Sequence, residues 1–358
     1  MHIILLILQV VFVISLLIFF HEMGHFISAR AVGVEIEEFG FGYPPKLAKI
    51  GEWKGTEFTL NWIPFGGFVR PKGEADETVE GGMAAAPAWK RLIILLSGPT
   101  MNFIIGTILL VMIYSAVGIP ASDQAMISQV VPGSPAMLVG LEPGDIILSV
   151  NGETIENIDA LIEVINQNAG TETTLTIERD GQTLSVQIIP RKDPPEGEGA
   201  MGIGLTNPLK PTPFFQSVGY AFKATGYIIK ETLLLPGRLI QGTVDPSLAR
   251  PVGYKGIYDI YSQAVSMDQE SDLPTAEPLP IFTLSIIANI SIALGITNLL
   301  PIPALDGGRI LFLLPELLFK KRIPQKWENV VNSVFFMLLI GLMIYITILD
   351  FTNPVVIP

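Results

Sequence analysis

The sequence IILLILQVVFVISLLIFF (residues 3–20) runs directly into HEMGHF (residues 21–26). The first part is apolar over a length close to the roughly 20 residues that a membrane-spanning helix needs. It has no basic segment before it and no small-residue cleavage site after it, so we expect it to be retained and not removed as a signal peptide. Two histidines and a glutamate are unfavourable at the end of such a segment, which indicates that they have a function.

The rest of the chain carries further segments of the same kind. Hydrophobic residues make up 49% of the sequence, and mean hydropathy is +0.50. The apolar residues are bunched into four runs that predict transmembrane helices: residues 3–27, 92–117, 281–300 and 331–349. The fold class expected is therefore a polytopic α-helical membrane protein.

The charges predict how these helices are oriented. Eight basic residues lie between Arg30 and Arg91, and five lie in the short segment between the third and fourth runs. The segment from residue 119 to residue 280 instead holds 9 basic and 20 acidic side chains. By the positive-inside rule, both termini and this acidic segment lie outside the cytoplasm. An acidic chain without a basic tract gives no indication of nucleic-acid binding.

The motif H-E-x-x-H predicts a zinc site. Helical spacing places His21 and His25 one turn apart on one face, where both rings reach a single ion. Glu22 is expected to act as the general base toward a zinc-activated water. A chance histidine pair at a helix end is the simpler alternative. Because only 3 histidines occur in the chain and two of them lie in this motif, the zinc site is favoured.

Asp306 is expected to complete this site. Catalytic zinc usually has three protein ligands, and the remaining histidine, His2, lies at the N-terminus. Asp306, in NLLPIPALDGGRI (residues 298–310), follows the third apolar run, and the predicted topology brings it to the cytoplasmic side with the histidines. The alternative is that Asp306 caps a following helix at residues 309–319. The chain has no cysteine that could serve as a thiolate ligand.

These motifs together resemble the site-2 protease family of intramembrane zinc metalloproteases. The sequence PAWKRLIILLSGPTMNFIIG (residues 87–106) is similar to the family's second-span signature, and TEFTLNWIPFGGFVRPKGE (residues 56–74) resembles its membrane-dipping β-hairpin. The subgroup it resembles is that of bacterial proteases like the regulator of sigma-E protease. The resemblance implies a bacterial inner (cytoplasmic) membrane location and zinc as the metal.

Two of these motifs suggest residues that bind substrate. In residues 56–67, alternation through Phe58 and Leu60 predicts a strand, and Pro64 to Gly67 is typical of a turn. A free strand edge at membrane depth can pair with an unwound substrate, for which Phe58, Leu60, Gly66 and Gly67 are candidates. A short hairpin without this role is the alternative. For Asn102, interhelical hydrogen bonding is the alternative to the place beside substrate that the resemblance implies.

The outer segment contains a compact module. Residues 127–190 alternate short β patterns with one predicted helix, residues 158–167. The run GSPAMLVGLEPGDIILSVNG (residues 133–152) resembles a bacterial PDZ domain, of α+β class. Residues 213–240 are apolar but interrupted by charges, which predicts an interfacial amphipathic helix. Residues 267–280 are expected to be a flexible acidic lead into the third span.

We therefore expect four regions: residues 1–118 with two spans, H-E-x-x-H and the β-hairpin; residues 119–210 with the PDZ domain; residues 211–280 as an extracytoplasmic amphipathic connection; and residues 281–358 with two spans and LDGG. The expected function is zinc-dependent cleavage of single-span membrane proteins in regulated intramembrane proteolysis, and the expected substrates include proteins that another protease has already trimmed. The alternative is a catalytically silent membrane scaffold that recruits partners through its PDZ domain.

Overall fold

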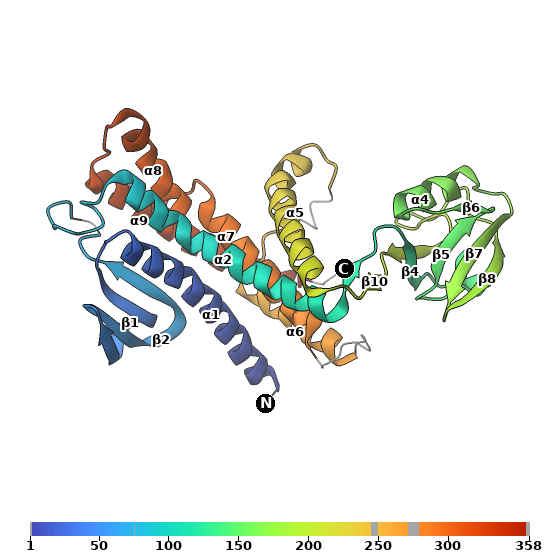
Figure 1. Cartoon of the computed structure of the whole chain (residues 1–358), viewed down its shortest axis with the longest axis horizontal. Coiled ribbons are helices and arrows are strands. Elements are labelled where there is room, and N and C mark those ends of the chain that lie inside the picture. The colour runs from blue at the N-terminus through green and yellow to red at the C-terminus, as the bar shows by residue number, and fades with distance from the viewer. Residues whose placement is uncertain (1, 75, 245–249, 271–278, 356–358) are drawn as a thin grey trace. The chain divides into compact units, whose positions relative to one another are not determined.

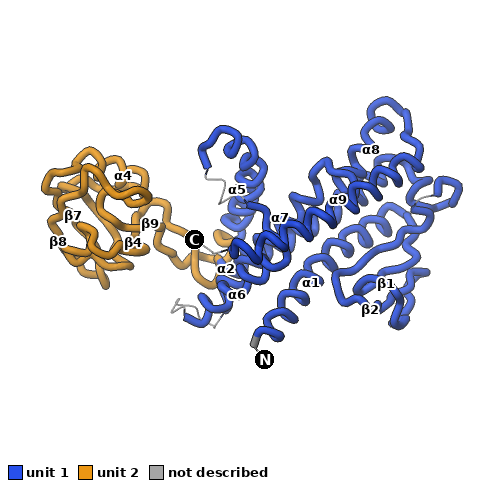
Figure 2. Tube along the Cα trace, turned by 180° about the vertical axis from the view of Figure 1, so that it is seen from behind, with its two compact units in different colours: residues 1–113, 218–358 blue, residues 114–217 orange. Residues whose placement is uncertain are grey.

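The structure is a computed structural model that describes residues 2–74, 76–244, 250–270 and 279–355. It divides into two compact units, residues 1–113 with 218–358, and residues 114–217 (Figure 2). Among the described residues, the first unit holds the long helices and a two-stranded sheet, and the second holds a six-stranded sheet, another two-stranded sheet and short helices (Figure 1).

Within the described residues, four helices are long and apolar enough to cross a membrane, by length and composition. They are α1 (His2–Ala31), α2 (Ala88–Val117), α7 (Ile281–Leu299) and α9 (Gln325–Thr352). Their centres coincide with the four predicted apolar runs, so the prediction of four such helices is confirmed. Three of them extend beyond the apolar runs because helical hydrogen bonding continues into polar flanks such as His21–Arg30.

The remaining helices of the first unit connect these four. They are α5 (Phe214–Ile240), α6 (Tyr254–Glu270) and α8 (Asp306–Phe319). The start of α5 falls one residue inside the predicted amphipathic helix. The acidic lead predicted at residues 267–280 begins as helix, because α6 extends through Glu270. Residues 271–278 of this lead lie outside the described residues.

Small residues bring α2 and α7 close together. A Cβ on Gly106 would lie 2.6 Å from Ile292, and one on Gly295 would lie 2.6 Å from the ring of Phe103. The Ser291 hydroxyl also donates to the carbonyl oxygen of Asn102 at 2.8 Å. Close backbone approach of this kind is how helices pack where lipid supplies no hydrophobic driving force.

The sheet of β1 (Ile36–Trp53) and β2 (Thr56–Pro71) differs from the hairpin that the sequence predicts. The turn between the strands is Lys54-Gly55, where both residues have positive φ, 49° and 80°. Both halves of β2 pair with β1, because Phe39 lies beside Phe58 on one side and Val69 on the other. Residues 64–67 therefore bend β2 and do not fold it back on itself. The prediction that residues 64–67 form the turn of a hairpin is therefore wrong, because the segments on either side of them pair with β1 and not with each other.

The second unit is a six-stranded sheet of order β8-β7-β5-β4-β9, with β6 beside β5. Its strands and helices are β3 (Ile119–Pro120), β4 (Ala125–Val130), α3 (Pro135–Leu138), β5 (Ile146–Val150), β6 (Glu153–Thr154), α4 (Ile158–Gln167), β7 (Thr173–Arg179), β8 (Gln182–Ile188), β9 (Ile203–Thr206) and β10 (Leu209–Lys210). The helix predicted at residues 158–167 has these same bounds in α4. Alternation along β7 buries Leu175 and Ile177 against Leu161 of α4, which forms the core.

Candidate metal centre

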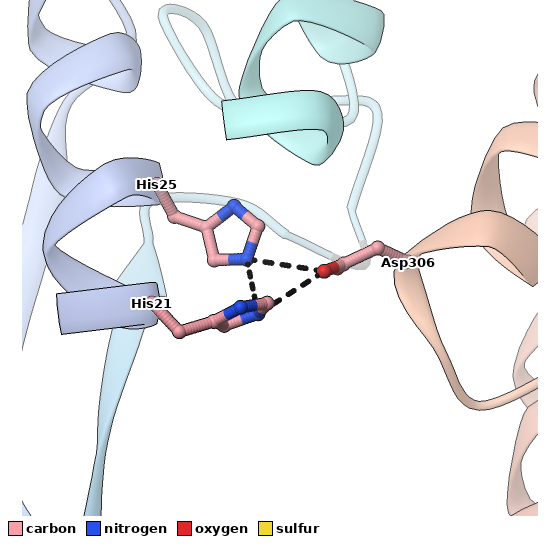
Figure 3. Close-up of side chains that lie close together, drawn as sticks. All are labelled: His21, His25 and Asp306. Carbon is pink, nitrogen blue, oxygen red and sulfur yellow. Dashed lines mark hydrogen bonds and ion pairs between the residues drawn. The ribbon is translucent and has the colours of Figure 1, made fainter. Parts of the chain in front are cut away.

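The helix α1 presents the two histidines of H-E-x-x-H toward one point. His21 and His25 lie one turn apart, and their Nε2 atoms are 3.1 Å from each other (Figure 3). His21 is buried, and His25 is partly buried. The spacing in the sequence therefore produces the juxtaposition expected from helical geometry.

Asp306 approaches the same point from α8 (Figure 3). Its Oδ2 lies 3.2 Å from Nε2 of His21 and 3.4 Å from Nε2 of His25. The residue preceding α8 is Leu305, and no side-chain hydrogen bond caps this helix. The carboxylate of Asp306 thus faces the histidines and does not act as the cap that was the alternative.

The three donor atoms have the separations that a tetrahedral zinc ion requires. Zinc bonds of about 2.0–2.1 Å at tetrahedral angles place neighbouring ligand atoms about 3.3 Å apart. The three separations here are 3.1, 3.2 and 3.4 Å. Moreover, Oδ2 of Asp306 is buried and accepts no hydrogen bond from the described residues. Two imidazoles and one carboxylate are also a common donor set for catalytic zinc, so the residues fit this metal.

A hydrogen bond orients the ring of His25 for ligation through Nε2. Its Nδ1 lies 2.7 Å from the carbonyl oxygen of Ile94 in α2. A carbonyl oxygen only accepts, so Nδ1 carries the proton and the lone pair is on Nε2. Such partners fix the tautomer and ring orientation of metal-binding histidines.

Asn102 holds the ring of His21 in the same way. Its side-chain amide is buried and lies 3.2 Å from Nδ1 of His21, on the side of the ring away from Asp306. The amide oxygen has no hydrogen-bond partner among the described residues. Turning the amide by half a turn exchanges nitrogen and oxygen, and Nδ1–H of His21 then donates to that oxygen. The predicted role of Asn102 beside substrate stays a prediction.

Two glycines allow α1 and α2 to meet at the site. A Cβ on Gly98 would lie 2.4 Å from Nε2 of His25 and 2.8 Å from Cε1 of His21. A Cβ on Gly24 would lie 2.4 Å from the carbonyl oxygen of Ser97. Both distances are far below van der Waals contact, so only glycine leaves room for the imidazoles between the two helices.

Glu22 lies beside the histidines in a polar cavity of about 310 Å³. Its Oε2 accepts a hydrogen bond from the backbone N–H of Val69 in β2, at 3.2 Å. The cavity is also lined by Tyr43, Phe68 and Arg309. Arg309 pairs with Glu74 at 2.7 Å. Glu22 therefore lies between the two histidines and residues 67–71 of β2, which form an edge of the sheet.

The residues that the sequence suggested for substrate binding do not line this cavity. Phe58 packs against the rings of Phe26 and Phe39, and Leu60 is exposed. A Cβ on Gly66 would lie 2.9 Å from Ile18, so Gly66 is in contact with α1. Their roles, and that of Gly67, stay predictions.

Sequence reasoning missed Phe68 and Val69 as cavity residues. They lie in the second half of β2, and their position follows from the bend at residues 64–67. Ser15 fixes this bend: its hydroxyl donates to the carbonyl oxygen of Pro64 and accepts from the N–H of Gly66, each at 3.1 Å. A serine inside an otherwise apolar span was the available signal for this contact.

The chain is similar over most of its length to known zinc metalloproteases. The family model described as "Peptidase family M50" matches residues 9–342. A Clostridium perfringens protein named "Putative zinc metalloprotease" is 33% identical, over 95% of this chain and 97% of that one. A Campylobacter jejuni protein with the same description is 32% identical, over 97% and 93%. The zinc metalloprotease RasP of Geobacillus kaustophilus is 27% identical, over 95% and 96%.

One solved structure also resembles part of the chain. It is the PDZ domain of an SdrC-like protein from Listeria monocytogenes, which is 21% identical and covers 23% of this chain and 87% of that one, with a TM-score of 0.21.

Proposed function

The chain belongs to peptidase family M50 and is a zinc metalloendopeptidase of the site-2 protease type, and from this we propose that His21, His25 and Asp306 hold the zinc and that Glu22 is the general base. The observation that supports the ligand assignment is the triangle of donor atoms, with separations of 3.1 to 3.4 Å. Bound zinc supplies Lewis-acid chemistry, since it polarises a scissile carbonyl and makes water acidic enough to attack near neutral pH.

The chain's own residues provide the proton transfer. The Glu22 carboxylate accepts the proton of the attacking water and passes it to the amine that leaves, which restores the carboxylate. The N–H of Val69 holds Oε2 of Glu22, so the carboxylate is oriented before substrate arrives. Proton transfer of this kind typically contributes roughly 10²–10⁴-fold to the rate.

The substrates proposed are single-span membrane proteins, cleaved within or near their transmembrane helix. This chain is itself a multi-pass membrane protein with four apolar helices. The edge segment of β2 at residues 67–71 borders the cavity that contains Glu22. An extended peptide added to this edge would present its carbonyl groups to the site. Phe58, Leu60, Gly66, Gly67 and Asn102 would shape or support that edge and the site beside it.

The orientation proposed places both termini and the second compact unit, residues 114–217, outside the cytoplasm. This unit is called the PDZ-like unit below. It follows from the excess of basic residues in the two remaining loops. On that side, the PDZ-like unit would select substrates that another protease has already trimmed. If deletion of residues 127–190 left cleavage of full-length and trimmed substrates equally fast, this selection would be refuted.

The test of the general base is Glu22→Gln in the detergent-purified protein. Glutamine retains an oxygen that can accept from the N–H of Val69, so we expect one zinc per chain as in the unchanged protein, with cleavage of a membrane substrate reduced at least roughly 10²-fold. Normal cleavage by Glu22→Gln would refute the assignment of the base. Absence of zinc from the folded, zinc-supplied wild-type protein would refute the metal site and favour the scaffold alternative.

A further inference from the structure

The loop that delivers Asp306 has an unusual backbone conformation. Between α7 and α8 the chain runs through PIPAL (residues 301–305), and Ala304 has φ of +79°. This left-handed region is unfavourable for a residue with a Cβ, by roughly 1–2 kcal/mol. A neighbouring contact must therefore help to hold Ala304, two residues before the proposed metal ligand, in this conformation.

Asn332 of α9 supplies such a contact. Its Oδ1 accepts a hydrogen bond from the backbone N–H of Ala304 at 3.0 Å. The bond joins the loop before α8 to α9, and its two residues are 28 positions apart in the sequence. Asn332 is a polar residue near the start of an otherwise apolar helix, where a hydrogen-bond partner such as the N–H of Ala304 is needed.

The loop has little freedom to adopt another path while this bond exists. A Cβ on Gly307 would lie 2.3 Å from the carbonyl oxygen of Leu299, and one on Gly308 would lie 2.2 Å from that of Ile302. The backbone thus folds tightly around the start of α8. The hydrogen bond to Asn332 connects this loop to α9. The position of Asp306 therefore depends on the position of α9.

The rest of α9 makes few buried contacts. Among its described residues only Asp350 is buried. The carboxylate of Asp350 accepts from the backbone N–H groups of Gly253 and Gly256, both at 2.9 Å, and pairs with Arg250. The helix is thus attached by polar groups near each end, with Asn332 at the end beside the metal centre.

We propose that Asn332 is a positioning residue for the metal centre, which sets the place of Asp306 by holding the N–H of Ala304. Without this bond Ala304 relaxes toward negative φ, and the carboxylate of Asp306 moves relative to His21 and His25. Asn332 itself touches neither the reacting atoms nor the metal. This inference rests on the proposed set of zinc ligands.

The experiment compares zinc affinity, measured by competition with a chelator, in purified full-length variants. Asn332→Ala removes the acceptor, and we expect roughly 10-fold weaker zinc binding, at the lower end of what loss of a supporting contact typically causes. Asn332→Asp keeps an oxygen acceptor in the same place and should restore most of the affinity. The matched control is Asn329→Ala, one turn away on α9, whose side chain accepts from Gln325 of the same helix and from no other described residue.

Kinetics give a second readout. With zinc in excess, Asn332→Ala should lower kcat and leave KM nearly unchanged, because the substrate edge of β2 is not altered. Wild-type zinc affinity in Asn332→Ala, in a protein with wild-type helicity, would overturn the inference but leave the proposed function standing. Equal losses in Asn332→Asp and Asn332→Ala would also overturn it. A wild-type protein without zinc would overturn both this inference and the proposed site.

Discussion

Gly98 lies directly against His25, so closely that a Cβ on the glycine would come within 2.4 Å of the ring's Nε2. The Nε2 edge of the histidine, which is its proposed metal-binding edge, therefore faces the backbone of α2. The site depends on a residue that contributes no functional group, because the space for both imidazoles exists only where α2 lacks a side chain.

We expect Gly98→Ala to disrupt zinc binding. The added methyl group would overlap with both rings, and it cannot be relieved by rotation of a flexible side chain because His25 is held by the carbonyl of Ile94. Overpacking of this kind typically costs about 1–3 kcal/mol. The measurement is zinc content and chelator competition, with Gly341→Ala as the control, since a Cβ there meets nothing within 4 Å. Unchanged affinity in Gly98→Ala would show that the helices separate more easily than the structure indicates.

We expect Asp306→Asn to lose most of the zinc while the protein remains folded. The amide has nearly the same shape as the carboxylate but lacks the negative charge that binds the ion. The loss of affinity should exceed the roughly 10–100-fold effect typical of residues that only support a ligand. Elemental analysis beside the unchanged protein is the measurement. Full retention of zinc in Asp306→Asn would show that a residue other than Asp306 is the third ligand.

We expect Ser15→Ala to impair cleavage without removing zinc. The variant loses the hydrogen bonds to Pro64 and Gly66, which together contribute about 2 kcal/mol at about 1 kcal/mol for each. The bend in β2 would loosen, and KM for a membrane substrate should rise roughly 10-fold. Ser333→Ala is the matched control, because in the part of the chain that the structure describes its hydroxyl bonds only to the Asn329 carbonyl within its own helix. Identical kinetics in Ser15→Ala and Ser333→Ala would contradict a role for the bend.

We expect the stability of the PDZ-like unit to fall at low pH because of Asp145. Burial raises the pKa of this carboxyl. The Arg179 guanidinium and the N–H of Glu142 lower the pKa by more than burial raises it, so the pKa of Asp145 lies below the ordinary value. The guanidinium binds both oxygens, each at 2.6 Å. Since the folded pKa is the lower one, the stabilisation is complete above the unfolded pKa of about 4 and is lost as pH falls through the folded value.

The same pair gives a mutational test. Asp145→Asn removes the buried carboxylate charge that pairs with Arg179 at 2.6 Å and leaves the guanidinium beside the exposed carboxylate of Glu142, at 3.1 Å, so this unit should be less stable. Hydrogen exchange of the full-length protein should then be roughly 100-fold faster in the amides of β5 and β7, with no change in α1. Exchange as slow as in the unchanged protein, or an equal acceleration throughout the chain, would show that the pair does not stabilise this unit locally.

The sequence predicted that three side chains from distant parts of the chain come together, and their role as zinc ligands stays a prediction. His21 and His25 follow from helical spacing alone, and Asp306 follows from charge and span order. The structure brings all three together. The bounds of α4 were also predictable, because Asn157 caps its start and Leu161 and Ile165 form a buried stripe.

The pairing of β2 could not be predicted in this way. Turn chemistry at residues 64–67 is compatible with either a hairpin or a bend, and the outcome depends on pairing with β1, which is non-local. The contact between Asn332 and Ala304 is hidden for the same reason. Asparagine shows that a span needs a polar partner, but not which backbone group supplies it.

The distance in sequence between His25 and Asp306 also imposes an order on biosynthesis. A ribosome adds roughly 5–20 residues per second, so about 15–60 seconds pass between these two residues. During that interval the nascent chain has both imidazoles in place but lacks the carboxylate from α8. With the proposed ligand set, the zinc site of a new molecule is completed only after residue 306 has been translated, so we expect no cleavage of neighbouring membrane proteins before that point.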